Sequence, residues 1–197
     1  LPGEGGRDRN GIIEGCKSGD ISTVILYGAD EIDRDELGGA FVIYIGSHGD
    51  RGAHGADVIL PAAAYTEKQA IFVNTEGRAQ MSERAAFPPG DAREDWKIFR
   101  ALSGHLDVTL DFDTVDALRK VMFELAPHLA RFDELVPTGV PEKPVADATE
   151  LDAAAFAPAL TDYYFTNPIA RASATMAACA EAKRERAKAI GGTGTDG

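Results

Sequence analysis

The stretch that decides the fold is residues 21–62, ISTVILYGADEIDRDELGGAFVIYIGSHGDRGAHGADVILPA. It contains three apolar runs, at 21–28, 40–45 and 56–62, and each run ends at or beside a glycine or a proline. β-Branched and aromatic residues fill these runs, which is typical of strands. Because the runs are continuous rather than alternating, they indicate strands covered on both faces, as in a parallel sheet between helices.

Further elements flank these runs. Residues 10–19 predict a short helix that stops at a serine–glycine pair. Residues 69–74 (QAIFVN) predict a fourth short strand, followed by a turn at 75–77. Helix and strand therefore alternate along the chain, which predicts the α/β class with parallel-sheet layers over residues 1–135.

Two more helices are predicted before the end of that domain. Residues 91–102 carry acidic residues in their first turn, which suits the N-terminus of a helix, and Ser103-Gly104 is expected to stop this helix. A second helix is predicted over 115–125, because its apolar residues recur at helical spacing. Either Asp113 or Thr114 is expected to cap it.

The composition changes after residue 135. Residues 136–149 are rich in proline and predict an extended, semi-rigid linker. Residues 150–190 predict a helical docking tail, in which Asn167 is the N-cap and Pro168 the first residue of one long helix. Residues 191–197 are expected to be disordered.

Charge and hydropathy exclude several partners. The chain of 197 residues has a net charge of −12, which opposes binding to nucleic acid and to anionic lipid headgroups. No apolar run approaches the roughly 18 residues that a membrane span needs. We therefore predict no nucleic-acid partner and no direct membrane insertion. The first residue is Leu1 rather than Met, so we expect missing elements N-terminal to it.

The two cysteines indicate packing rather than redox chemistry. Cys16 and Cys179 lie far apart in the sequence and form no CxxC motif. An iron–sulfur cluster needs four ligands, so this chain alone is not expected to bind one. A single long-range disulfide is the alternative to two small packing groups.

The glycine-rich loop after the second run has the residues with the clearest chemical potential. Ser47, His48, Asp50, His54 and Asp57 include metal-ligating types, but such residues among glycines are more typical of turn formers. A hydrolase triad is not predicted, because adjacent residues seldom face one another and the GxSxG motif is absent. We therefore predict no metal site and no catalytic residue.

Three other features leave alternatives open. The spacing GxxGxxG at 49–55 matches neither a dinucleotide motif nor a P-loop, yet a loop after a parallel strand could still cradle a phosphate. Glu67 and Lys68 could form an acid–base pair, although adjacent opposite charges are more typical of a solvated surface with a capping role. The aromatic cluster at 163–165 suits either a partner protein or the chain's own domain.

One stretch is more specific than composition can explain. Residues 56–68 (ADVILPAAAYTEK) and 73–80 (VNTEGRAQ), continued by 87–98 (FPPGDAREDWKI), resemble the signature of the molybdopterin oxidoreductase superfamily. Within it, residues 42–50 (VIYIGSHGD) and 162–177 (DYYFTNPIARASATMA) are similar to the C-terminal part of the large iron–sulfur subunits, the G or 75-kDa type, of NADH:ubiquinone oxidoreductase, respiratory complex I.

The resemblance implies a function for the intact subunit. Such subunits carry electrons from NADH toward quinone through 4Fe-4S and 2Fe-2S clusters bound upstream of this segment, within a proton-translocating NADH dehydrogenase. They lie peripherally at the inner membrane, on the cytoplasmic face in bacteria or the matrix face in mitochondria. Their partners are other peripheral-arm subunits. Their C-terminal region keeps the molybdopterin-enzyme fold but has lost the cofactor.

The resemblance therefore predicts a non-catalytic scaffold segment without a cofactor of its own. Only Asn74, Glu76 and Arg78 stand as vestigial pterin-site candidates. One alternative is a fragment of a catalytic molybdopterin-dependent oxidoreductase, such as a formate dehydrogenase, in which these three residues would help to hold the dinucleotide. A second alternative is a free-standing interaction module. Catalytic members continue into a β-rich domain, whereas here the proline-rich linker follows.

Overall fold

The computed structural model describes residues 5–135, 160 and 162–189 of the chain. The chain divides into two compact units, Leu1–Pro137 and Thr138–Gly197. The predicted linker at 136–149 and the end predicted to be disordered at 191–197 lie outside the described residues.

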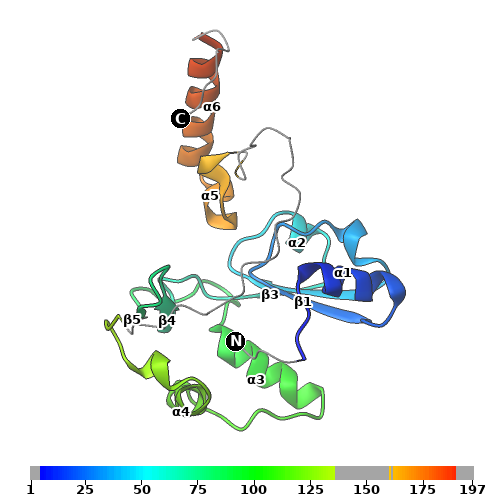
Figure 1. Ribbon diagram of the computed structural model, residues 1–197, viewed down its shortest axis with the longest axis vertical. Helices are drawn as coiled ribbons and strands as arrows, with labels where there is room; N and C mark the ends of the chain where they lie inside the picture. The colour runs from blue at the N-terminus through cyan, green and yellow to red at the C-terminus, as the bar shows by residue number, and fades with distance from the viewer. Residues whose placement is uncertain (1–4, 136–159, 161, 190–197) are drawn as a thin grey trace, which may run out of the picture. The chain divides into compact units, whose positions relative to one another are not determined.

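A three-stranded parallel sheet organises the first unit (Figure 1). Its strands, in spatial order, are β1 (Thr23–Tyr27), β2 (Phe41–Gly46) and β3 (Val58–Pro61). The register pairs Val24 with Val42, and it pairs Tyr44 with both Leu26 and Ile59. The three apolar runs are therefore strands, and the predicted parallel sheet of an α/β fold is confirmed.

The hydrophobic core lies on one face of this sheet. The helix α1 (Arg9–Ser18) and the 3₁₀ helix η1 (Arg34–Leu37) supply its other side. Its buried members are Ile13, Cys16, Val24, Leu26, Leu37, Ala40, Val42 and Tyr44. Each fully buried aliphatic side chain contributes about 2 kcal/mol to folding. Both cysteines are free, and Cys16 is one of the core's packing groups.

The opposite face of the sheet is covered only in part. The helix α3 (Asp95–His105) lies on that side, so α1 and α3 are on opposite sides of the sheet in Figure 1. Phe99 of α3 meets Tyr27 edge to face, with ring centroids 5.4 Å apart. Ile25 and Phe41, on the same face, are 39% and 46% exposed. Among the described residues, helices therefore lie on both faces of the sheet as predicted, and the cover on the α3 side is partial.

A β-hairpin follows the parallel sheet. β4 (Ala70–Val73) was predicted, and it pairs antiparallel with β5 (Ala79–Ser82), which was not. The sequence AQMS of β5 has little strand propensity, so its conformation comes from pairing with β4. Ala79 also bridges to Phe132, and this contact ties the hairpin to the segment near residue 132.

Side-chain caps begin some of the helices of the first unit. The remaining ones are α2 (Arg51–His54), α4 (Val115–Leu125) and the 3₁₀ helix η2 (Pro127–Ala130). Thr114 rather than Asp113 caps α4, because its hydroxyl accepts a hydrogen bond from Ala117 N at 3.1 Å. The predicted stop of α3 at Ser103 is wrong. The Ser103 hydroxyl donates to Arg100 O at 2.7 Å and accepts from Leu110 N at 3.0 Å, so it fastens the chain beyond the helix.

The described part of the second unit, residues 160 and 162–189, is mainly helical. It contains η3 (Tyr163–Phe165), α5 (Pro168–Ala172) and α6 (Ala174–Ala189). Asn167 caps α5 as predicted, accepting from Ala170 N at 2.9 Å. The prediction of one long helix is wrong, because Ser173 is extended (φ −83°, ψ 120°) and its hydroxyl accepts from Met176 N at 3.3 Å. Ser173 therefore ends α5 and caps α6. No helix in the described parts of the chain is long and apolar enough to cross a membrane.

Candidate functional site

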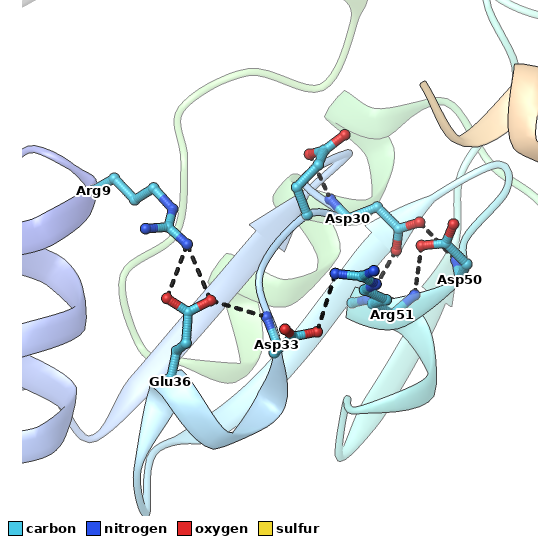
Figure 2. Close-up of polar contacts among 8 residues, drawn as sticks. Arg9, Asp30, Asp33, Glu36, Asp50 and Arg51 are labelled. Carbon is cyan, nitrogen blue, oxygen red and sulfur yellow. Dashed lines mark hydrogen bonds and ion pairs between the residues drawn. The ribbon is translucent and has the colours of Figure 1, made fainter. Parts of the chain in front are cut away.

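The loops after β1 and β2 meet at the carboxyl edge of the parallel sheet. Asp30, in the loop after β1, is only 1% exposed. Its two carboxylate oxygens accept hydrogen bonds from backbone amides of the next loop, at 2.7 Å from Asp50 N and 2.9 Å from Gly52 N (Figure 2). Ligands of open α/β sheets bind at this edge, where free backbone amides attract anions. The Asp30 carboxylate therefore accepts the hydrogen bonds of two amides at this edge.

Gly52 makes this contact sterically feasible. A Cβ atom at position 52 would lie 2.8 Å from the Ala29 carbonyl oxygen and 3.0 Å from Asp30 Oδ1. Both distances are shorter than carbon–oxygen van der Waals contact, and the first involves rigid backbone. Only glycine lets the two loops approach closely enough for Asp30 to reach both amides.

A chain of charged contacts surrounds this closed edge (Figure 2). Arg51, at the start of α2, pairs with Asp33 at 3.6 Å. Glu36 of η1 accepts from Asp33 N at 3.3 Å and pairs with Arg9 of α1 at 2.9 Å. The Asp33 backbone amide, and after it the Arg9 guanidinium, hold the pKa of Glu36 below its usual value. These contacts link α1, η1 and α2 around the loops.

The other polar residues of the loop after β2 take part in local contacts. The Tyr44 hydroxyl donates to the His48 carbonyl oxygen, and His48 Nδ1 lies 3.1 Å from Ser47 Oγ. Asp57 instead accepts from Val42 N at 2.7 Å, next to β3. No group of three or more His, Cys, Asp or Glu side chains is placed to hold a metal ion within the described residues. Ser47 and His48 therefore make contacts within the turn itself.

The three vestigial pterin-site candidates lie together in the turn between β4 and β5. Asn74 Oδ1 accepts from Glu76 N and from Arg78 N, both at 3.0 Å. Arg78 donates to the carbonyl oxygen of Asp133 at 2.5 Å and lies 3.4 Å from the Glu76 carboxylate. Gly77 provides the left-handed conformation (φ 83°) that closes the turn. The polar groups of this turn therefore bond mainly to one another.

Lys68 and Asp95 form a polar contact that the sequence analysis missed. Glu67 and Lys68 do not act as a pair, because Glu67 accepts from Ala64 N at 2.9 Å. Lys68 instead forms an ion pair with Asp95, the first residue of α3, and their side chains are only 19% and 13% exposed. Burial, and after it the neighbouring Asp95 carboxylate, raise the pKa of Tyr27 well above its usual value.

A cavity of 280 Å³ adjoins this ion pair. Residues of β4, the first turn of α3 and one side of α4 line it, and they include Lys68, Asp95 and Arg119. The residues that line this cavity come from β4, α3 and α4, which are far apart in the sequence. No sequence motif therefore marks the cavity, and only the folded structure shows it.

Comparison with known families places the fold in a class. Residues 5–105 match the family model of the molybdopterin oxidoreductases. This match covers half of the chain, and the chain therefore belongs to the molybdopterin oxidoreductase family. Residues 137–179 match a second model, which describes the C-terminal region of the G-type subunit of NADH-ubiquinone oxidoreductase. The resemblance found in the sequence is thus confirmed in both of its parts.

Curated relatives narrow the class further. The chain is 44% identical over 168 residues to the mitochondrial NADH-ubiquinone oxidoreductase 78 kDa subunit of Neurospora crassa, covering 82% of this chain and 23% of that protein. It is 45% identical over 166 residues to the corresponding subunit of Candida albicans, covering 79% of the chain and 23% of the relative. A mitochondrial NADH dehydrogenase [ubiquinone] iron-sulfur protein 1 of Solanum tuberosum is 45% identical over 158 residues, which is 79% of the chain and 21% of that protein. The chain thus spans less than a quarter of these relatives.

Proposed function

We propose that this chain is a scaffold segment of the large iron–sulfur subunit of NADH–ubiquinone oxidoreductase and contributes no catalytic residue. The observation that carries the proposal is the Asp30 carboxylate bound to the amides of Asp50 and Gly52. A dinucleotide phosphate at this edge would lie beside a buried carboxylate, and two adjacent buried negative charges repel strongly. The residues present therefore do not fit the dinucleotide cofactor that the family name implies.

The hairpin turn supports the same proposal. Asn74, Glu76 and Arg78 bond within the turn and to the Asp133 carbonyl oxygen, so holding a ligand would require breaking contacts that stabilise the hairpin. We propose that these three residues are a vestige of a pterin site, retained because they close the turn.

The similarity to these relatives supports a role in the whole assembly. We infer that the intact subunit passes electrons from NADH toward quinone through 4Fe-4S and 2Fe-2S clusters held by other parts of the longer polypeptide. The assembly would be the proton-translocating enzyme at the inner membrane, with this segment on its matrix or cytoplasmic face. Its partners would be other peripheral-arm subunits.

The second unit is the part proposed to dock on a partner. Its family match over 137–179 is to a C-terminal region found in that subunit. Tyr163 is 70% exposed and Ile169 is 40% exposed, whereas Tyr164 packs edge to face on Tyr163 at 5.7 Å. Exposed aromatic and aliphatic side chains are typical anchors of protein interfaces. We propose that residues 150–190 act as this docking tail and that residues 1–135 form the domain it extends.

Truncation in the intact subunit tests the scaffold role. Deleting residues 150–197 should lower the amount of assembled complex on native gels, while the residual complex keeps its iron–sulfur EPR spectra. Deleting only residues 190–197 is the matched control and should leave assembly unchanged. Loss of cluster signals at a normal level of assembly would contradict the proposal.

Elemental analysis tests the catalytic alternative. Molybdenum and tungsten should be far below one atom per complex in the purified assembly, measured by mass spectrometry against its iron content. One atom of either metal per complex would support a pterin-dependent oxidoreductase and contradict the scaffold proposal.

A further inference from the structure

The outer edge of β1 has no strand beside it in the described part of the chain. β1 stands at one end of the order β1-β2-β3, and neither isolated bridge between other residues involves it. Its sequence, TVILY, contains no charged residue and no proline, and its register with β2 is continuous, without a bulge. Natural proteins protect free edge strands with such residues or bulges. The composition of β1 is therefore that of a strand with a neighbour on each side.

Alternate residues of β1 direct their backbone groups to this free edge. Ser22 O accepts a hydrogen bond from the first amide of β2, and Gly28 N donates to Ile45 O, both at 2.8 Å. These two bonds fix the phase of the parallel ladder, so the even-numbered residues of β1 face β2. The odd-numbered residues point their N–H and C=O groups to the free edge instead. They are Thr23, Ile25 and Tyr27.

The connections between the strands determine which strand belongs at this edge. η1 joins β1 to β2, and α2 joins β2 to β3. Residues of α1, η1 and α2 pack in the same core, so these helices lie on one face of the sheet (Figure 1). Parallel crossovers share one hand, and those on one face therefore advance in one direction across the sheet. A strand that leads into β1 through α1 would thus lie on the side of β1 away from β2.

The sequence just before α1 does not supply this strand. Residues 1–8, LPGEGGRD, contain three glycines and a proline and no run of strand-forming residues. Asp8 is already the N-cap of α1. Loops from a strand to the next helix are commonly about 2–6 residues long, so the strand should end shortly before residue 1. The chain spans only 23% of its Neurospora crassa relative, which leaves ample polypeptide to form it.

We propose that the residues preceding this segment in the intact subunit form a fourth parallel strand on the free edge of β1, with α1 as the crossover between them. This added strand is apolar and rich in β-branched residues, as its neighbours are. The inference rests on the proposed function, because it takes the chain to be a segment of the longer subunit. A second copy fits less well, since two-fold pairing of β1 with β1 would be antiparallel and would leave α1 without a strand to connect.

Hydrogen exchange of single amides, measured by NMR, tests the added strand. Two chains are compared: the 197-residue chain, and the same chain extended at its N-terminus by roughly 15 residues of the intact subunit, enough for one strand and its turn. In the 197-residue chain, the amides of Thr23, Ile25 and Tyr27 should exchange fast, whereas Val24 and Leu26 are protected by β2. In the extended chain this alternation should disappear, because the three odd-numbered amides slow by at least about tenfold.

A proline variant assigns the protection to the backbone of β1. Ile25→Pro removes a donor that points to the free edge and no bond to β2, so it should leave the 197-residue chain folded. In the extended chain it should restore fast exchange at Thr23 and Tyr27. Ile25→Thr keeps the amide and the β-branched shape, and it is the matched control that should keep the protection. The comparison of the two unsubstituted chains decides the question if Ile25→Pro does not fold.

Three results would overturn the proposal. The first is an alternation that persists in the extended chain. The second is protection of the odd-numbered amides in the 197-residue chain that rises with its concentration, because a second copy would then occupy the edge. The third is protection gained only in the assembled complex, which would assign the edge to another subunit. None of these results depends on iron–sulfur clusters or on residues 150–197, so the scaffold role and the added strand can fail separately.

Discussion

Asp30 and Asp95 are both carboxylates withdrawn from solvent, but the first unit surrounds them with different partners. Asp30, at the sheet edge, accepts from two backbone amides, one with each carboxylate oxygen. Asp95, at the start of α3, pairs through Oδ2 with the Lys68 side chain, and its Oδ1 has no hydrogen-bond partner. The first carboxylate is held by backbone amides, and the second by side chains, those of Lys68 and Tyr27.

This difference shows where the molecule can still bind something. Backbone donors are fixed by the loop itself, so an external anion could replace Asp30 only if the loop were rebuilt. The ion pair of Asp95 uses the Lys68 side chain as its donor, and a cavity adjoins this ion pair. The edge that α/β sheets ordinarily use for ligands is therefore closed by the Asp30 carboxylate, whereas a cavity of 280 Å³ adjoins the ion pair of Lys68 and Asp95.

Removal of the Asp30 carboxylate should have the largest effect on stability. Asp30→Ala leaves the amides of Asp50 and Gly52 without acceptors, and the Gly52 amide is buried. We expect the free energy of unfolding, measured by urea denaturation, to fall by about 4 kcal/mol. Glu134→Ala, which removes an exposed ion pair with Arg131, is the matched control and should cost less than about 1 kcal/mol. An equal loss of unfolding free energy in the two variants would show that the hydrogen bonds from the Asp50 and Gly52 amides to Asp30 stabilise the fold no more than an exposed ion pair does.

Loss of Lys68 should have the next largest effect. Lys68→Met keeps most of the apolar stem but leaves Asp95 buried without its cation, and we expect a loss of about 3 kcal/mol. Lys188→Met is the control, because Lys188 pairs with Glu185 at an exposed position and should cost under about 0.5 kcal/mol. The same denaturation series measures both variants. A loss near the control value would mean that Asp95 finds solvent or another donor.

The sequence predicted the elements better than their contacts. The three apolar runs, the helix at 10–19 and the cap at Asn167 were predicted from local patterns, because strand propensity and capping act over a few residues. The break at Ser173 was missed although serine is itself a capping residue, because the alanines around it suggested an unbroken helix. β5 was missed because its conformation depends on pairing with β4.

The polar sites were less predictable, since they join residues far apart in the chain. Asp30 and Gly52 are 22 positions apart, and Lys68 and Asp95 are 27 apart. One signal was present for the first contact: an aspartate follows the glycine that ends a buried strand, where parallel strands place their loops at one edge. No comparable signal marked Arg119, because its place beside the same cavity as Asp95 depends on how α4 packs.

The hairpin turn was predicted better than the contact of Lys68 with Asp95, because its residues are close in the sequence. A variant in this turn should have a moderate effect on stability. Arg78→Lys cannot keep both the bond to the Asp133 carbonyl oxygen and the contact with Glu76. We expect a loss of about 1 kcal/mol, seen as faster hydrogen exchange of the Asp133 amide, which donates to Ala79 O at 2.9 Å. Arg131→Lys, in an exposed pair with Glu134, should leave that exchange rate unchanged. If the Asp133 amide exchanges at the same rate in Arg78→Lys and in the wild type, the proposal that Arg78 is retained because it closes the turn is wrong.

The smallest expected effect is a dependence of folding stability on alkaline pH, which arises from Tyr27 beside Asp95. Burial and the Asp95 carboxylate raise the pKa of Tyr27 in the folded state above its usual value of 10.0. The unfolded chain therefore loses this proton first, so the contribution is present below pH 10 and declines as the pH rises above it. Tyr27 is 54% exposed, and solvent screening reduces the expected effect to roughly a few tenths of a kcal/mol.

Tyr27→Phe should remove this decline, whereas Tyr163→Phe in the second unit should keep it. Thermal unfolding between about pH 9 and 11 measures the difference between the two variants, because the other titrating groups contribute equally to both. In Lys68→Met, the uncompensated Asp95 carboxylate should make the alkaline decline steeper. In Asp30→Asn it should stay the same, because the altered carboxylate belongs to the other site. A change of slope in Asp30→Asn would mean that the two carboxylates are coupled and do not act as separate sites.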